Sequence, residues 1–382
     1  MSTPVPTLGS FCKFQSGVAF PEPLQGKKNG DFPFIKVSDM KLRANRSKII
    51  VANNWLDQAE AESIGAKPVP VGSIVFAKIG LGLYSNRMRL ITQPTLIDNN
   101  MLAAIPNENI TSSELYSILL RIDMATWAIG AALPYLRTSD LAKVPLDHID
   151  FGELPSTANI IESLSLLEDE NFAKISLMNE ISQVFFHQWF QKVDRENLPI
   201  GWERGKLSDL ARLSKLTINP QKFPQKEFLH YSIPAFDSGL GPDVTLGADI
   251  HSNKFTIQEK CVLLSKLNPR TCRVWVSSTS SEITSICSTE FLPLIPNEEV
   301  PIAYLYHLLT SPSFRWLLKS WVTGTTNSHQ RVRPEEVMNL PCVIPPVNIM
   351  KRFGEFSSSE LNLSSSTLEQ DKTSSEVKFQ FL

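Results

Sequence analysis

Two stretches of the chain concentrate side chains that can donate hydrogen bonds to phosphates and to the edges of nucleic-acid bases. The first basic cluster lies between residues 78 and 89 and consists of Lys78, Tyr84, Asn86, Arg87 and Arg89. The second basic cluster consists of Lys266, Arg270 and Arg273. Arginine, lysine, asparagine and glutamine recognise base edges, whereas basic and hydroxyl groups also contact phosphates. The spacing therefore predicts two DNA-contact regions.

A third polar stretch follows Gly324 and adds hydroxyls, an amide and two arginines. Its candidate contact residues are Thr325, Thr326, Asn327, Ser328, His329, Arg331 and Arg333. Each of these side chains could equally be an ordinary solvated side chain that contacts no DNA. We therefore predict at least one contact in each cluster rather than a role for each residue. His329 has no nameable partner for proton transfer, which favours a hydrogen-bonding role over a catalytic base.

The sequence predicts no catalytic or metal site. Gly80 to Ser85 approaches a dinucleotide-binding motif but lacks its third glycine and a following βαβ pattern. Asp243, Glu259 and Lys260 do not fit a nuclease site. In such sites one residue usually separates the glutamate from the lysine, whereas Glu259 and Lys260 are consecutive. The five cysteines are scattered without a C-x-x-C pair, which favours neither zinc binding nor a disulfide framework.

The composition of the chain limits which other classes of protein it can belong to. The formal net charge is -2, so the chain as a whole has no polyanion-binding signature, and DNA contact needs local basic patches or a basic partner. No apolar run reaches the roughly 18–20 residues of a membrane span. The first residues lack the features of a signal peptide. We expect a cytoplasmic protein with reduced thiols.

An internal repeat organises the elements that must position these clusters. Ile105-Pro106-Asn107-Glu108 recurs as Ile295-Pro296-Asn297-Glu298. Five further matches occur in the same order: residues 74–78 with 262–266, 115–119 with 305–309, Trp127, Gly130 and Arg137 with Trp321, Gly324 and Arg331, 144–145 with 340–341, and 159–160 with 348–349. Six ordered matches indicate a duplicated module.

Each half is predicted to be a mixed module of strands with one packing helix. Short apolar runs predict strands at residues 34–37, 74–77, 231–233 and 262–264. A helix follows the first Pro-Asn-Glu turn, with Tyr116, Leu119 and Leu120 at helical spacing. The tryptophans Trp189, Trp202, Trp316 and Trp321 are expected in the core.

From Ala158 the pattern becomes helical, with apolar residues at alternating steps of four and three. This heptad stripe consists of Ile160, Leu164, Leu167, Met178, Ile181 and Phe185, and the polar Asn171 and Lys174 interrupt it. The spacing is typical of a coiled coil, although a stripe that covers a globular core is the alternative. A second stripe near the C-terminus consists of Ile349, Phe353, Phe356 and Leu363, before a serine-rich tail.

Several of these segments resemble the specificity (S) subunit of type I restriction-modification systems. They are residues 72–78 (Gly-Ser-Ile-Val-Phe-Ala-Lys), 97–101 (Ile-Asp-Asn-Asn-Met), the turn at 106–108, residues 182–190 followed by 198–203, and the run from Gly324 to Arg333 with Pro341 after it. The resemblance extends over nearly the whole chain, including its duplication.

The resemblance implies an α+β fold with a pseudo-twofold internal repeat. Two tandem mixed α/β target recognition domains, residues 1–155 and 197–346, would be joined by long antiparallel coiled-coil helices at 156–196 and 347–382. A helix of about 35 residues spans about 50 Å, so the central helix would set the distance between two half-sites.

The resemblance also implies the partners. Each domain would read one half of a split site in double-stranded DNA, and the helices would dock two methyltransferase (M) subunits. Restriction-translocase (R) subunits would join the complex. The chain would need no cofactor itself, with S-adenosylmethionine, ATP and Mg²⁺ bound on the partners. Ala131-Ala132-Leu133 in the first half replaces Thr325-Thr326-Asn327 of the second, so we expect an asymmetric site.

Two alternatives stay open at this point. The same modules could serve another phage-defence methyltransferase, of a type IIB-like system. In the second alternative, a protein-interaction scaffold, the duplicated domains bind protein and the helices dimerise. Salt dependence separates the scaffold from the DNA-binding alternatives, because phosphate contacts weaken steeply as salt rises.

Overall fold

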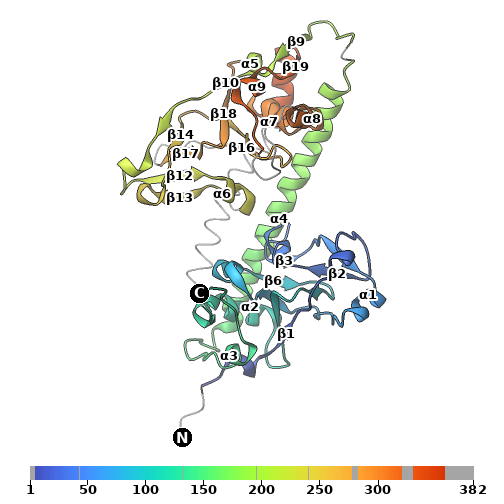
Figure 1. Cartoon of the computed structure of the whole chain (residues 1–382), viewed down its shortest axis with the longest axis vertical. Helices are drawn as coiled ribbons and strands as arrows, with labels where there is room; N and C mark the ends of the chain where they lie inside the picture. The colour runs from blue at the N-terminus through green and yellow to red at the C-terminus, as the bar shows by residue number, and fades with distance from the viewer. Residues whose placement is uncertain are drawn as a thin grey trace. The chain divides into compact units, whose positions relative to one another are not determined.

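A computed structural model describes residues 5–42, 44–130, 132–194, 196–239, 241–277, 283–320 and 330–357. The described residues form two compact units, which divide between Ala173 and Lys174 (Figure 1). This boundary lies inside the long helix α4 (Leu154–Phe186), which the π-helical turn His187–Gln191 continues. The two units are described separately below.

The first unit is built on the sheet β1-β8-β5-β6-β3. Its strands are β1 (Cys12–Ser16), β8 (Met101–Pro106), β5 (Ile74–Ala77), β6 (Met88–Ile91) and β3 (Lys48–Ile49). All four residues of β5 are buried, as expected of a central strand covered on both faces. Helix α2 (Ser112–Leu120) begins with a capping box between Thr111 and Glu114 and packs against one face through Leu115, Ile118 and Leu119.

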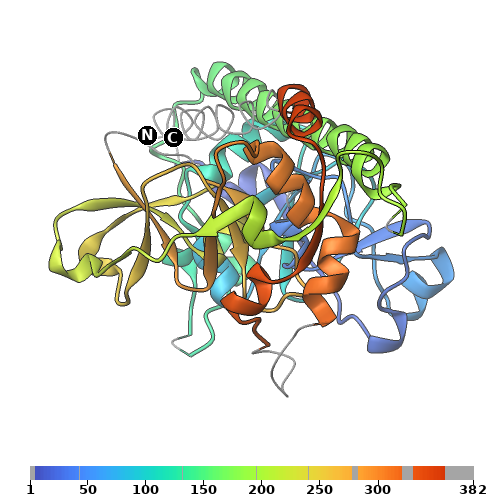
Figure 2. The same cartoon turned by 90° about the horizontal axis from the view of Figure 1, so that it is seen from above.

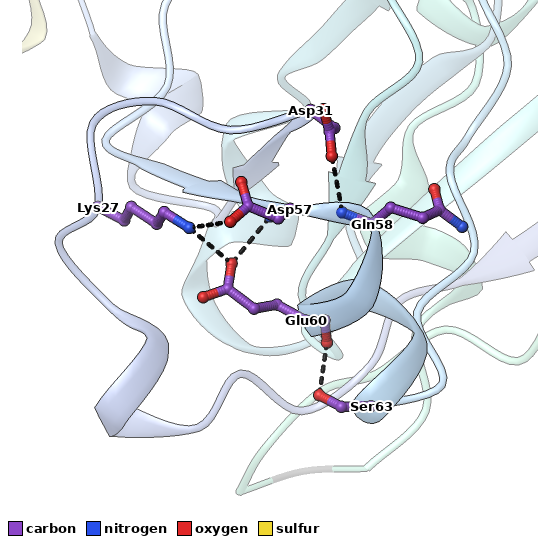
Figure 3. A network of polar contacts seen from close by, with 6 residues as sticks. All are labelled: Lys27, Asp31, Asp57, Gln58, Glu60 and Ser63. Carbon is purple, nitrogen blue, oxygen red and sulfur yellow. Dashed lines mark hydrogen bonds and ion pairs between the residues drawn. The ribbon is translucent and has the colours of Figure 1, made fainter.

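A smaller sheet, β4 (Asn54–Leu56), β2 (Phe32–Ile35) and β7 (Leu96–Ile97), extends the first unit beside helix α1 (Gln58–Ser63). Polar contacts tie the preceding loop to the start of α1 (Figure 3). Lys27 pairs with Asp57 and Glu60, and the backbone N–H of Gln58 donates to Asp31. The loop is thereby held against the helix.

The second unit contains a corresponding pair of sheets, of four and five strands. The first is formed by β10 (Ala211–Leu213), β18 (Phe291–Pro296), β15 (Val262–Ser265) and β16 (Val274–Val276). The second is formed by β11 (Thr217–Ile218), β14 (Lys254–Ile257), β17 (Thr284–Ser288), β12 (Glu227–Tyr231) and β13 (Asp243–Leu246). In both units the second sheet contains a parallel pair, β2 with β7 and β12 with β17.

The helices of the second unit are mostly short. They are α5 (Leu207–Leu210), α6 (Ile233–Ser238), α7 (Ile302–Thr310), α8 (Pro312–Ser320), α9 (Pro334–Met338) and a helical segment at 347–357. The strands β9 (Glu203–Lys206) and β19 (Pro341–Ile344) form an antiparallel pair. The end of α4, helix α7 and the segment 347–357 lie side by side around an aromatic core (Figure 2).

The Pro-Asn-Glu turns perform the same structural task in both units. The side-chain amide of Asn107 donates to the Ser10 carbonyl at 2.8 Å, and that of Asn297 donates to the Asp209 carbonyl at 2.9 Å. Their backbone N–H groups also donate to equivalent carbonyls, those of Phe11 and Leu210. The recurring tetrapeptide therefore joins the end of a central strand to the first segment of its unit.

The structure corrects two details of the sequence-based prediction and refines a third. Tyr135, and not Arg137, corresponds to Arg331, because Tyr135 bridges to Ile79 as Arg331 bridges to Leu267. The strand predicted at 231–233 ends at Tyr231, since Ser232 caps helix α6. In α2, Leu119 is buried as predicted, and the other buried apolar residues are Leu115 and Ile118, whereas Tyr116 and Leu120 are partly buried against the same core.

The buried face of α4 differs from the heptad stripe. Its buried residues are Leu154, Thr157, Ala158, Ile161, Ser165, Glu168, Ser182 and Phe186. Within the heptad stripe, Leu164 and Met178 are half-buried, whereas Ile160, Leu167, Ile181 and Phe185 are between 37% and 47% exposed. Most of these buried residues follow a heptad position by one residue, about 100° around the helix, so the heptad stripe does not cover the core of either unit.

The C-terminal stripe divides in the same way. Phe353 is fully buried in the second unit and Ile349 packs against the same core. Phe356 is 45% exposed and contacts Phe185 of α4 with ring centroids 4.7 Å apart. Leu363 lies outside the described residues. None of the described helices is long and apolar enough to cross a membrane.

Candidate nucleic-acid interface

In each unit a central strand ends at a lysine that a returning segment holds in place. In the first unit Leu136 donates its N–H to the Lys78 carbonyl at 3.0 Å. In the second unit Val332 donates to the Lys266 carbonyl at 3.1 Å. The structure therefore brings each predicted basic cluster beside the later segment of its own unit, 134–137 or 330–333.

The residue two positions after each lysine adopts a left-handed backbone conformation. Gly80 has a φ of 78° and Asn268 a φ of 48°. Both N–H groups donate to the returning segment, to Pro134 and Gln330 respectively, at 2.8 Å. Glycine and asparagine are the residues that adopt this conformation most readily. Two different residues thus produce the same loop geometry in the two units.

Three members of the first basic cluster face solvent at least in part. Tyr84 is 64% exposed, and Lys78 is half-buried with its ammonium 3.3 Å from the Ser16 hydroxyl. Arg87 is half-buried and forms no hydrogen bond or ion pair with the described part of the chain. Tyr84 and Arg87 can meet a phosphate or a base edge without losing a partner among the described residues, and Lys78 keeps further N–H donors beside its bond to Ser16.

Asn86 and Arg89 serve the fold instead. The Asn86 amide donates to the Ile122 carbonyl at 3.0 Å and accepts from the Met124 N–H at 3.3 Å. The Arg89 guanidinium donates to the carbonyls of Met40, Asn45 and Met88. Burial lowers the pKa of Arg89 to about 10. With these bonds in place, neither side chain is free to recognise DNA.

Arg89 also lies near Asp169 of α4, a residue that the sequence pattern did not single out. The Ser47 hydroxyl donates to Asp169, and Arg46 lies 5.8 Å from the ring centre of Phe172. Burial raises the pKa of Tyr116 to about 12. These contacts hold the first half of α4 against the strands that carry the first basic cluster.

The contrast between Arg87 and Arg89 yields a prediction. Arg89→Ala leaves buried carbonyls unpaired and lowers the free energy of unfolding of the first unit by about 1–3 kcal/mol. Arg87→Ala, two residues away, leaves that energy within about 0.5 kcal/mol of wild type but weakens DNA binding. Urea unfolding and duplex binding of both variants test this. Equal stabilities of the two variants would contradict the structural role of Arg89.

The second basic cluster and the arginines after the polar run also divide into two groups. Arg273 makes two bonds to Asp237, at 2.7 and 2.9 Å, and Arg331 makes two to Glu290, at 3.1 and 3.0 Å. The exposed Arg270 forms no hydrogen bond or ion pair with the described residues, and neither does the half-buried side chain of Lys266.

Arg333 is 70% exposed at its side chain and lies 4.0 Å from Glu336, at the limit of an ion pair. Five other predicted contact residues, Thr325, Thr326, Asn327, Ser328 and His329, lie outside the described residues. So does Trp321, which was expected in the core.

Sequence reasoning missed the outer face of α8. Trp316 was expected in the core, but it is 69% exposed, whereas Phe314 and Leu318 on the other face are buried. Lys319 is exposed and Arg315 half-buried beside it. The signal was present in the spacing, because residues 314 and 318 lie one helical turn apart and place residue 316 opposite them.

No group of three or more metal-ligating side chains occurs among the residues that the structure describes. The two cavities at the end of α4 lie in the second unit, and one is lined in part by Phe186, Tyr304 and Phe314. Its apolar lining belongs to the aromatic core.

Comparisons with known proteins agree with this architecture. No family model and no curated protein matches the chain. Among solved structures, the S subunit of a type I restriction-modification system from M. genitalium matches with a TM-score of 0.54 at 12% identity, covering 100% of this chain and 96% of that one. The chain therefore shares the fold of that S subunit.

Two further solved structures match at lower TM-scores. The HsdS subunit from Thermoanaerobacter tengcongensis has a TM-score of 0.33 at 14% identity, covering 98% of this chain and 93% of that one. A chain from a study of type I R-M complex assembly and conformational transition has a TM-score of 0.35 at 13% identity, with 99% and 95% covered.

Proposed function

We propose that this chain is the DNA sequence-specificity subunit of a type I restriction-modification complex. The observation that carries the proposal is the fold, which matches an S subunit from end to end. The geometry of the two units supports it, because each presents a lysine at the end of a central strand beside a second polar segment. Two such surfaces suit a DNA site that consists of two halves.

In this proposal residues 1–155 and 197–346 are target recognition domains. The groups that contact DNA are Lys78, Tyr84 and Arg87 in the first, with Lys266, Arg270, Arg333 and the polar run 325–329 in the second. Lysine and arginine neutralise phosphates, while tyrosine, asparagine and arginine can also bond to base edges.

The helices 156–196 and 347–382 form the spacer and the docking surface in this proposal, as an antiparallel coiled coil. The exposed members of the heptad stripe, together with the Phe185–Phe356 contact, support this assignment. Such an apolar stripe is costly in water unless a partner covers it. Two methyltransferase subunits would dock there, and the restriction subunits would join them in the cytoplasm.

The chain's part in the reaction is recognition. S-adenosylmethionine, ATP and Mg²⁺ would bind to the methyltransferase and restriction subunits, which carry out methyl transfer and cleavage. This chain determines where the complex binds on DNA. Its side chains bind bases and phosphates and take no part in methyl transfer or cleavage.

The deciding experiment is methylome sequencing of cells that express this chain with the neighbouring methyltransferase gene, against cells without this chain. We expect a split motif with a fixed gap, methylated only when the chain is present. Methylation that is absent, or independent of the chain, would overturn the proposed function and favour a protein scaffold.

The same experiment tests the asymmetry of the site. The two units differ at the positions that enter the contact loops, Gly80 against Asn268 and Tyr135 against Arg331. Different side chains at equivalent places favour different bases, so the two half-sites should not be inverted copies of each other. Recovery of a perfect palindrome would refute this prediction.

A further inference from the structure

The loop 266–273 of the second unit lies in a surface whose acidic groups are already neutralised. Asp237 is paired with Arg273, and Glu290 is paired with Arg331. The remaining cations of the loop, Lys266 and Arg270, have no acidic partner among the described residues. The loop therefore carries an excess of positive charge.

Helix α8 adds to this excess. Cys272 of the loop packs against the same hydrophobic core as Phe314, Leu317 and Leu318 of α8. The positive charges of Arg315 and Lys319 act to lower the pKa of the Cys272 thiol, although burial raises it more. Both observations place the cationic residues of α8 next to the loop.

The outer face of α8 also presents a large aromatic side chain that the core does not use. Trp316 is 69% exposed, while Arg315 has a buried Nε without a hydrogen-bond partner in the described structure. In the first unit, the segment after α2 forms only the short 3₁₀ helix Met124–Trp127. The exposed aromatic and basic helix face is therefore a feature of the second unit.

We propose that Arg315, Trp316 and Lys319 of α8, together with Lys266 and Arg270, form a binding surface for the phosphate backbone of double-stranded DNA. Charge complementarity commits the surface to a polyanion, since its cations have no acidic partner within the part of the chain that the structure describes. Lys319 and Arg270 neutralise phosphates, and the Trp316 indole lies against a sugar and donates its N–H to a phosphate oxygen. The inference rests on the proposed function and adds α8 to its contact residues.

The test measures binding of the full chain to a random-sequence 40-base-pair duplex at salt concentrations between roughly 50 and 200 mM, where phosphate contacts change affinity strongly. Each lost phosphate contact makes the slope of log affinity against log salt shallower by about 0.9. Between the lowest and the highest salt concentration, the affinity of such a variant therefore falls by a factor that is roughly 3-fold smaller than for wild type. We expect that decrease for Lys319→Ala and again for Arg270→Ala. Trp316→Ala weakens binding with little change of slope.

Lys351→Ala is the matched control, since it removes the same charge from an exposed lysine that is paired with Glu299. It should leave the slope unchanged. Because the substituted side chains of α8 are exposed, thermal unfolding of the variants should match wild type, which separates loss of contact from loss of fold.

The outcomes distinguish a failure of the α8 surface from a failure of the proposed function. If wild type binds with a steep salt dependence but the α8 variants behave like Lys351→Ala, the α8 surface is wrong and the proposed function stands. If wild type shows no salt-dependent duplex binding, both fall. Duplex binding that Trp316→Ala leaves intact, together with lost binding of the methyltransferase subunit, would assign the face to a protein partner and overturn the inference.

Discussion

Replacing Phe353 by alanine should lower the free energy of unfolding of the second unit by about 3–5 kcal/mol. Phe353 is fully buried, and its ring lies between 5.3 and 6.1 Å from the rings of Phe186, Trp189 and Phe190. The substitution removes these contacts and leaves a cavity that rigid aromatic neighbours cannot close. Urea unfolding followed by tryptophan fluorescence measures the effect, since Trp189 belongs to the same core.

Phe356→Ala is the control on the same helical segment. Phe356 lies three residues later and is 45% exposed, so its truncation should cost less than about 1.5 kcal/mol. Similar losses for the two variants would contradict the division of this stripe into a buried and an exposed part. Loss of methyltransferase binding in Phe356→Ala, with stability retained, would support the docking surface in the proposed function.

A four-residue helical insertion after Lys174 should change the gap between the two half-sites and leave both half-sites intact. Four residues lengthen an α-helix by about 6 Å, a little more than one turn. Base pairs are spaced about 3.4 Å apart, so the gap should change by about two base pairs. Methylome sequencing of cells that express the insertion variant reads the half-sites and the gap together.

Lys174→Ala without an insertion should retain the original motif, because Lys174 is exposed and the helix keeps its length. An insertion variant that methylates the original motif with its original gap would rule out α4 as the element that sets the spacing. A variant that methylates only one half-site would show that the insertion damages a recognition unit instead.

The strands were the most predictable part of this chain. Residues 74–77 and 262–264 are apolar throughout, and both lie in fully buried central strands. Asn107 and Asn297 were found by repetition alone, and their hydrogen bonds explain why an amide occurs at both places. Continuous burial and repeated turns leave a local signature, because they depend on neighbouring residues.

The contact residues were less predictable, since their fate depends on partners far away in the sequence. Arg87 and Arg89 are the same type of residue in the same short stretch, but only Arg89 donates hydrogen bonds to the carbonyls of Met40 and Asn45. Trp316 resembles a core residue in type, although the buried positions of α8 are Phe314 and Leu318. Hydrogen-bond partners that lie 44 to 49 residues away cannot be deduced from residue type alone.

The central helix illustrates a different limit. Six of its apolar side chains follow a heptad, which pointed to a partly exposed face, whereas Ala158 and Ser165 lie on the buried one. Small residues permit close approach of a helix to a sheet, so size as well as polarity decides which face is covered.

Each unit contains a long segment whose two ends are joined by a hydrogen bond. Leu8 donates its N–H to the Val144 carbonyl, and Leu207 donates to the Leu340 carbonyl, both at 3.0 Å. A segment whose two ends are hydrogen-bonded neighbours can be replaced without stretching the chain on either side. If the proposed function holds, replacing residues 8–144 or 207–340 with the corresponding segment of another specificity subunit should therefore change one half-site and leave the rest of the chain unchanged.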